Sequence, residues 1–324
     1  MECMISTVFG NNDNDKIEEL MVMIKLLSLS LPKSASDSDD ATIRVLVCVL
    51  SSCKGKSISS PYTVLEAITS IVTSSSSSSS SSKYKLQSNE AESLRNIIVQ
   101  CLHGGAPEKV RDGTLSCIQD LLSSSSSCLS LSWTVEDKAS VGQFSMLLCS
   151  IVRGEFHLLL QELITLYDDS SETNDTSDSN DSSKVKVEVI IDRRERTLSM
   201  IHVCCNLMES FLVLLVGKAQ IDDDNDSDDE MDTGIDDETP LWSSLPYTCL
   251  LHMRESFHSV CQDIFEFIDT VTNKNNSSSI DIRVISRLCE TISIWVSEDE
   301  GMIPPVIKYA PCIMKCSSLS SSFS

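Results

Sequence analysis

The sequence predicts an all-α protein made of paired helices that are joined by loops of very unequal length. Aliphatic residues are plentiful while the aromatic share is only 5%, which favours helices packed by aliphatic side chains over a β-sandwich. Within most blocks the apolar residues recur at steps of three and four, the period of one helix face. Serine-rich and acidic stretches separate these blocks, and they lack the apolar residues that a core requires.

The helical period is clearest in two blocks near the C-terminus. After Pro246, apolar residues recur every three or four positions from Leu250 to Val271, and a polar stripe with the same period runs opposite them. The next block repeats the pattern with Ile285, Leu288, Ile292 and Trp295. We expect Asp281 to cap this second helix, and Pro304 and Pro305 to open another one.

The other blocks predict eight more helices and one candidate strand. The helices are expected over Lys16–Leu31, Ala41–Cys53, Pro61–Thr73, Glu90–Leu102, Pro107–Leu122, Asp137–Ile151, Glu155–Tyr167 and Arg193–Val216. The stretch Lys184–Ile191 alternates valine with charge and is typical of a strand, although no partner strand can be identified. Because helices follow one another along the chain, we expect an irregular armadillo- or HEAT-like α-solenoid with disordered serine-rich and acidic inserts.

The inserts divide the chain into eight expected segments. The folded ones are N-terminal helical repeats at 1–73, central helices at 90–167, a long apolar helix at 190–220 and C-terminal helical repeats at 246–316. The others are a serine-rich linker at 74–89, acidic disordered inserts at 168–189 and 221–245, and a disordered tail at 317–324.

The net charge of −23 is concentrated in three tracts that contain no Lys or Arg. Asp37–Asp40, Asp168–Asp181 and Asp222–Glu238 hold three, six and eleven acidic residues, so the rest of the chain is nearly neutral. A field of this sign opposes nucleic acid, because phosphate contacts need Lys and Arg. We therefore expect other proteins as partners, with basic segments attracted to the acidic tracts, and no nucleic acid.

The chain offers no catalytic, metal-binding or cofactor-binding constellation, so we expect no enzyme and no cofactor. Gly55-Lys56-Ser57 lacks the leading glycine and the preceding strand of a phosphate-binding loop. The five histidines form neither HxxxH nor HExxH, and the fourteen cysteines form no CxxC pair. Most cysteines lie in apolar helical stretches and are expected to be free buried thiols, which together with the absence of a signal peptide predicts the cytoplasm.

One residue is a candidate site of covalent modification. Ser227 is followed by Asp228, Asp229 and Glu230, a context that suits an acid-directed kinase. A phosphate there would extend an already negative tract, so we expect it to act by recruiting a basic partner.

The alternative function is that of a membrane-associated protein, anchored through 198–216 or through an acylated Cys3. The segment Leu198–Val216 is largely apolar, but it contains Asn206 and Glu209. A carboxylate near the middle of a membrane span costs roughly 2.5–3.5 kcal/mol. The interpretation as a covered helix of a solenoid is therefore favoured.

Five segments follow one another in an order found in a known family. They are Val141–Phe156, Met200–Leu215, Met253–Glu255, Ile282–Asp299 and Ile303–Ala310. In the fourth, a helix ends in a tryptophan and an acidic pair, and a proline-containing helix follows. Over roughly residues 107–316 the chain resembles the neurochondrin family. The resemblance implies a cytoplasmic, armadillo-like, non-enzymatic protein that acts as an interaction scaffold or signalling adaptor.

Overall fold

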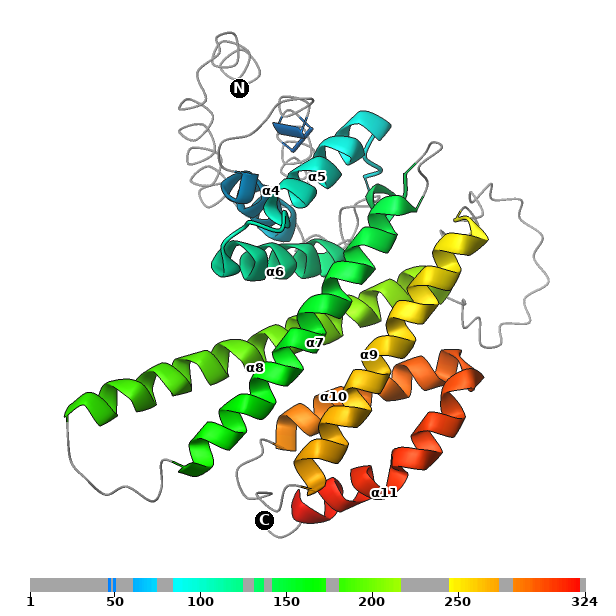
Figure 1. Ribbon diagram of the computed structural model, residues 1–324. Coiled ribbons are helices and arrows are strands. Elements are labelled where there is room, and N and C mark those ends of the chain that lie inside the picture. The colour runs from blue at the N-terminus through cyan, green and yellow to red at the C-terminus, as the bar shows by residue number, and fades with distance from the viewer. Residues whose placement is uncertain are drawn as a thin grey trace. The chain divides into compact units, whose positions relative to one another are not determined.

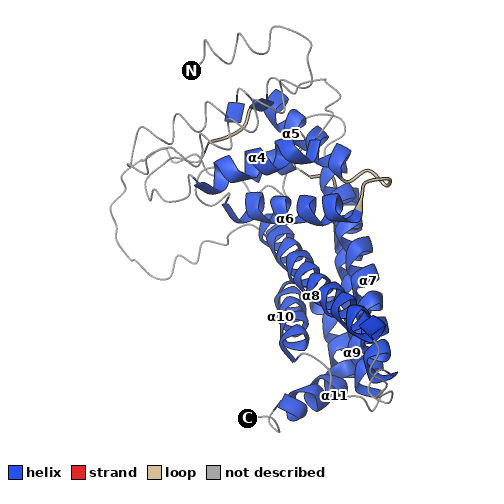
Figure 2. Ribbon diagram, turned by 90° about the vertical axis from the view of Figure 1, so that its left-hand side faces the viewer, coloured by secondary structure: helices blue, strands red, loops and turns tan. Residues whose placement is uncertain are grey.

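The described part of the molecule is all-helical. The computed structural model describes residues 46–47, 49–50, 61–74, 84–124, 131–136, 142–172, 181–216, 245–273 and 282–320. Within these ranges the regular elements are α-helices and two short 3-10 helices, with no strand among them (Figure 2). The chain divides into two compact units, Met1–Ser145 and Met146–Ser324. The predicted all-α class is confirmed for the part of the chain that is described.

Three helices of the first unit pack against one another through apolar faces. They are α4 (Pro61–Ser74), α5 (Ser88–Cys101) and α6 (Glu108–Ser124), and each contacts the other two (Figure 1). The side chains between them are aliphatic and buried: Leu65 and Ile68 on α4, Leu94 and Ile98 on α5, and Ile118 and Leu121 on α6. The bounds of all three helices lie within two residues of the predicted ones.

A 3-10 helix that the sequence pattern did not predict covers α5. This element, η1 (Leu131–Thr134), places Trp133 fully in the core, against the ring of Phe144. The buried guanidinium of Arg95 donates to the carbonyls of Trp133 at 3.0 Å and Val135 at 3.2 Å. Because these carbonyls lie outside any α-helix, Arg95 supplies the donors that their burial requires.

The second unit contains the longer helices. They are α7 (Gln143–Glu172), whose first residues lie at the unit border, α8 (Asp181–Val216), α9 (Tyr247–Asn273), α10 (Ile282–Glu298), the 3-10 helix η5 (Glu300–Met302) and α11 (Ile303–Ser320). α9 contacts both α10 and α11, and α10 also contacts α8. α7 and α9 lie side by side (Figure 1), and His157 Nδ1 of α7 lies 3.1 Å from Asp263 Oδ1 of α9.

Two predictions in this unit are wrong. The helices expected over Asp137–Ile151 and Glu155–Tyr167 are one continuous helix, α7, because a single Gly154 costs only about 1 kcal/mol and does not end a helix. The strand expected over Lys184–Ile191 lies inside α8. A lone strand leaves its backbone groups without partners, whereas a helix satisfies them internally, and valine lowers helix propensity only slightly.

The remaining predictions differ in extent or cannot be placed. α7 continues to Glu172 and α8 begins at Asp181, so both helices extend into the segment 168–189 that was expected to be an acidic insert. Residues 16–31, most of 41–53 and the cap Asp281 lie outside the described residues.

A glycine allows α4 and α6 to approach closely. A Cβ built on Gly113 of α6 would lie 2.2 Å from the hydroxyl oxygen of Tyr62 and 2.5 Å from its ring. Gly154 of α7 is also in a helix, but a Cβ there would meet nothing within 4 Å. Alanine at Gly113 would therefore clash with Tyr62, whereas alanine at Gly154 would change only the helix propensity.

We expect Gly113→Ala to lower the free energy of unfolding by about 1–3 kcal/mol, because the clash with Tyr62 outweighs the gain in helix propensity. The matched control Gly154→Ala should raise it by about 0.5–1 kcal/mol. Urea unfolding followed by circular dichroism measures both changes. Equal stabilisation by the two substitutions would contradict the close approach of α4 to α6.

Candidate functional site

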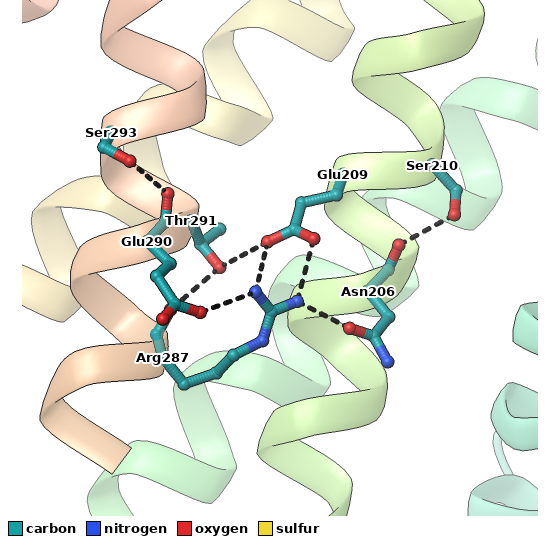
Figure 3. A network of polar contacts seen from close by, with 7 residues as sticks. All are labelled: Asn206, Glu209, Ser210, Arg287, Glu290, Thr291 and Ser293. Atoms are coloured by element: carbon teal, nitrogen blue, oxygen red, sulfur yellow. Dashed lines mark hydrogen bonds and ion pairs between the residues drawn. The ribbon is translucent and has the colours of Figure 1, made fainter. Parts of the chain in front are cut away.

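A cluster of polar side chains in the second unit joins α8 to α10. Figure 3 shows the guanidinium of Arg287, on α10, between the carboxylates of Glu209 and Glu290. It contacts both oxygens of Glu209 at 2.8 Å and donates to Asn206 Oδ1 at 2.5 Å. The hydroxyl of Thr291 donates to Glu209 at 3.1 Å. Asn206 and Glu209 of α8 thus contact Arg287 of α10, so the cluster fixes the position of α10 along α8.

Burial distinguishes the two carboxylates of this cluster. The side chains of Arg287 and Glu209 are 15% and 22% exposed, whereas that of Glu290 is 60% exposed. Burial acts to lower the pKa of Arg287, but the hydrogen bond and the charge of Glu209 outweigh it and the pKa is raised. Arg287 is therefore held charged, and Glu209 is its main partner.

A second cluster surrounds Asp299, between α10 and η5. The carboxylate accepts from Arg254 Nε at 2.7 Å and from the backbone N–H of Gly301 at 2.9 Å, and it contacts His258 Nε2 at 2.8 Å. The hydrogen bond from Arg254 is the main reason why the pKa of Asp299 lies well below its usual range. The ring of His258 also meets Trp295 edge-on. This cluster attaches the turn before α11 to α9.

Further polar contacts join α7 to its neighbours. Ser150 Oγ and His252 Nε2, on α7 and α9, lie 2.9 Å apart. Glu162 of α7 pairs with Arg193 and, at 3.8 Å, with Arg196, both on α8. Like the clusters of Arg287 and Asp299, these contacts use ionisable side chains to connect helices. In the described ranges no group of three His, Cys, Asp or Glu residues could hold a metal ion.

Seven of the described cysteines are buried in the helical core, as predicted: Cys101, Cys117, Cys149, Cys204, Cys205, Cys249 and Cys261. Burial raises the pKa of Cys101 and of Cys205 to about 11, and that of Cys261 to about 12. These thiols are therefore protonated at neutral pH and act as small apolar core residues.

The exposed apolar side chains of α11 form a separate feature, which we call the α11 stripe. It consists of Ile303, Ile307, Pro311 and Met314, which lie four, four and three residues apart and so share one helix face. The side chains of Ile303, Ile307 and Met314 are 43%, 68% and 71% exposed, and Pro311 is exposed as well. Large exposed apolar residues that lie next to one another mark interaction sites.

The opposite face of α11 is attached to α9. The ring of Tyr309 stacks on Phe265, with centroids 4.8 Å apart and planes 3° from parallel. The thiol of Cys312 donates to Asp269 Oδ1 at 3.4 Å. The α11 stripe is therefore presented by a helix whose other side is fixed, which makes the stripe the candidate functional site.

The other candidate residues predicted from the sequence, Ser227 with its acidic tract and Cys3, lie outside the described residues. The α11 stripe was missed, although its helix was predicted. The spacing of Ile303, Ile307 and Met314 could have revealed a common face, but which side of the helix contacts α9 depends on the packing.

Comparison of the chain with protein-family models, with curated proteins and with solved structures gives no match in any of the three. Among the helices of the described residues, α8 with its apolar segment 198–216 included, none is long and apolar enough to cross a membrane.

We expect Glu209→Ala to lower the free energy of unfolding by about 1–3 kcal/mol, because a largely buried arginine loses its main carboxylate partner. The matched control Glu290→Ala removes an exposed carboxylate from the same arginine and should cost less than about 1 kcal/mol. Both values come from urea unfolding curves at neutral pH. Equal losses of unfolding free energy in the two variants would show that Glu209 is not the main partner of Arg287.

Proposed function

We propose that this chain is a neurochondrin-like, non-enzymatic protein-protein interaction scaffold or signalling adaptor of the cytoplasm. The observation that carries the proposal is the α11 stripe, an exposed apolar face on a helix whose other side is packed on α9. Exposed apolar residues cost free energy in water, and binding another protein removes that cost. The resemblance to the neurochondrin family in the segments around Trp295 supports the same function.

The architecture we propose for this scaffold is an irregular α-solenoid. Helices that follow one another in the chain pack side by side in each unit: α4 on α5, α5 on α6, α9 on α10 and α10 on α11. Such packing buries the apolar face of each helix against its neighbour.

The polar clusters support a scaffold in a second way. Arg287, Asp299 and Glu162 each join two elements of the second unit through short contacts with oppositely charged or polar side chains. These residues hold helices in register, which a binding surface needs in order to keep its shape. The acidic tract at 221–240 would add attraction for partners with basic segments.

The test is affinity purification from cytosol with quantitative mass spectrometry. We expect Ile307→Asp to reduce the recovery of specific partners by about tenfold, because a charge in the middle of the stripe opposes apolar burial. The control Leu158→Asp places the same charge at an exposed leucine of α7, outside the stripe, and should leave recovery unchanged. Unchanged recovery with Ile307→Asp, in a variant with normal helicity, would refute the stripe as the binding surface.

A further inference from the structure

One exposed serine at the end of α10 is followed by three acidic residues. Ser297 is the second-last residue of this helix, and Glu298, Asp299 and Glu300 follow it directly. The exposed serines of the described ranges are Ser88, Ser123, Ser199, Ser293 and Ser297. Among these five, Ser297 alone has acidic residues at all three following positions. Basic residues of an acid-directed kinase recognise such charges, so this context distinguishes Ser297 from the other exposed serines.

The local structure places the hydroxyl of Ser297 where the helix ends. Its Oγ donates to the carbonyl of Ile294 at 2.7 Å, within the last turn of α10. The helix ends at Glu298, and Asp299 already has an extended backbone, with φ of −135° and ψ of 98°. Helix ends open locally at a small cost in free energy, so the last turn can adopt the extended conformation in which a kinase binds its substrate.

The three acidic residues differ in their surroundings. The carboxylate of Asp299 lies 2.7 Å from Arg254 Nε, and its side chain is 11% exposed. Glu298 and Glu300, on either side of it, are exposed. The carboxylates at the first and third positions after Ser297 are therefore accessible to the basic residues of a kinase.

From these observations we propose that Ser297 is a phosphorylation site of an acid-directed kinase and that the phosphate weakens the last turn of α10. Ser297 Oγ bonds to the γ-phosphorus of a nucleoside triphosphate, and the bond from that phosphorus to the nucleoside diphosphate breaks. The hydroxyl proton passes to a base of the kinase, which also supplies the nucleotide and Mg²⁺. This inference goes beyond the proposed function, because it does not depend on the α11 stripe.

The phosphate would project away from α9. Trp295 stacks on Phe257 of α9, and Ser297 lies about 200° further around the helix axis, on the opposite side of α10. Arg254, which is on α9, therefore gains no ion pair with the phosphate. A modification that ordered the structure would need such a basic partner, so the phosphate acts through repulsion.

The groups around Ser297 oppose a further negative charge. A phosphate adds about −1.5 to −2 charges. The C-terminal end of α10 is the negative pole of the helix dipole, and Glu298 Oε1 lies 3.4 Å from Ser297 Oγ. We therefore expect phosphorylation to loosen the connection from α10 to α11, which runs through Asp299 and η5.

The first experiment treats the full-length chain with an acid-directed kinase and ATP and maps the phosphopeptides by mass spectrometry. We expect phosphate on Ser297 and none on Ser293, which is exposed on the same helix but is followed by three apolar residues. Glu300→Gln should slow the labelling of Ser297 by about fivefold, because the kinase loses an acidic contact. Unlabelled Ser297, equal labelling of Ser293, or unchanged labelling in Glu300→Gln would overturn the assignment.

The second experiment measures hydrogen exchange in the phosphorylated chain. Its control is Ser297→Ala treated with the same kinase, which carries any phosphate added elsewhere and also lacks the hydroxyl, so the comparison isolates the charge. We expect amides of 298–303 to exchange about two- to fivefold faster in the phosphorylated chain, while those of 260–268 in α9 stay unchanged. Equal exchange of 298–303 in the two chains would overturn the weakening of the turn.

Discussion

The structure of the second unit depends on the burial of one face of α9. Twelve residues of this helix are buried, and two of its aromatic side chains stack on neighbouring helices. Phe257 stacks on Trp295 of α10 with centroids 4.6 Å apart, and Phe265 stacks on Tyr309 of α11. Each buried apolar side chain contributes about 1.5–3 kcal/mol, so the face of α9 outweighs any single polar contact. α10 and α11 are positioned because both pack on this one face.

Polar contacts then determine how the helices align. Two helices that pack through apolar faces can slide along each other, because the buried apolar area is nearly the same at several registers. A bidentate pair such as Arg287 with Glu209 is satisfied at only one register, and the contacts of Asp299 with Arg254 and Gly301 fix one geometry of the turn before α11. The orientation of the α11 stripe therefore follows from residues that do not belong to it.

The period of apolar residues was enough to predict most of the helices. Leu250 to Val271 and Ile285 to Trp295 predicted α9 and α10 closely, because both have one apolar and one polar face. Local patterns failed where the deciding partners are distant in sequence. Arg95 stabilises η1 from 38 residues away, and no pattern around Trp133 indicates it.

The candidate site was harder to predict than the fold. Isoleucine and methionine are ordinary core residues, so their identity alone does not place Ile307 in solvent. Its exposure depends on the stacking of Tyr309 on Phe265, which assigns the opposite face of α11 to the core.

Hydrogen exchange with mass spectrometry on Ile264→Asp tests the central claim most directly. Ile264 is fully buried on α9, and Leu251→Asp provides a control at a position of α9 that is 38% exposed. If the face of α9 stabilises its neighbours, amides of α9, α10 and α11 lose protection together in Ile264→Asp and keep it in Leu251→Asp. Loss of protection confined to α9, with α10 and α11 unchanged, would contradict the account.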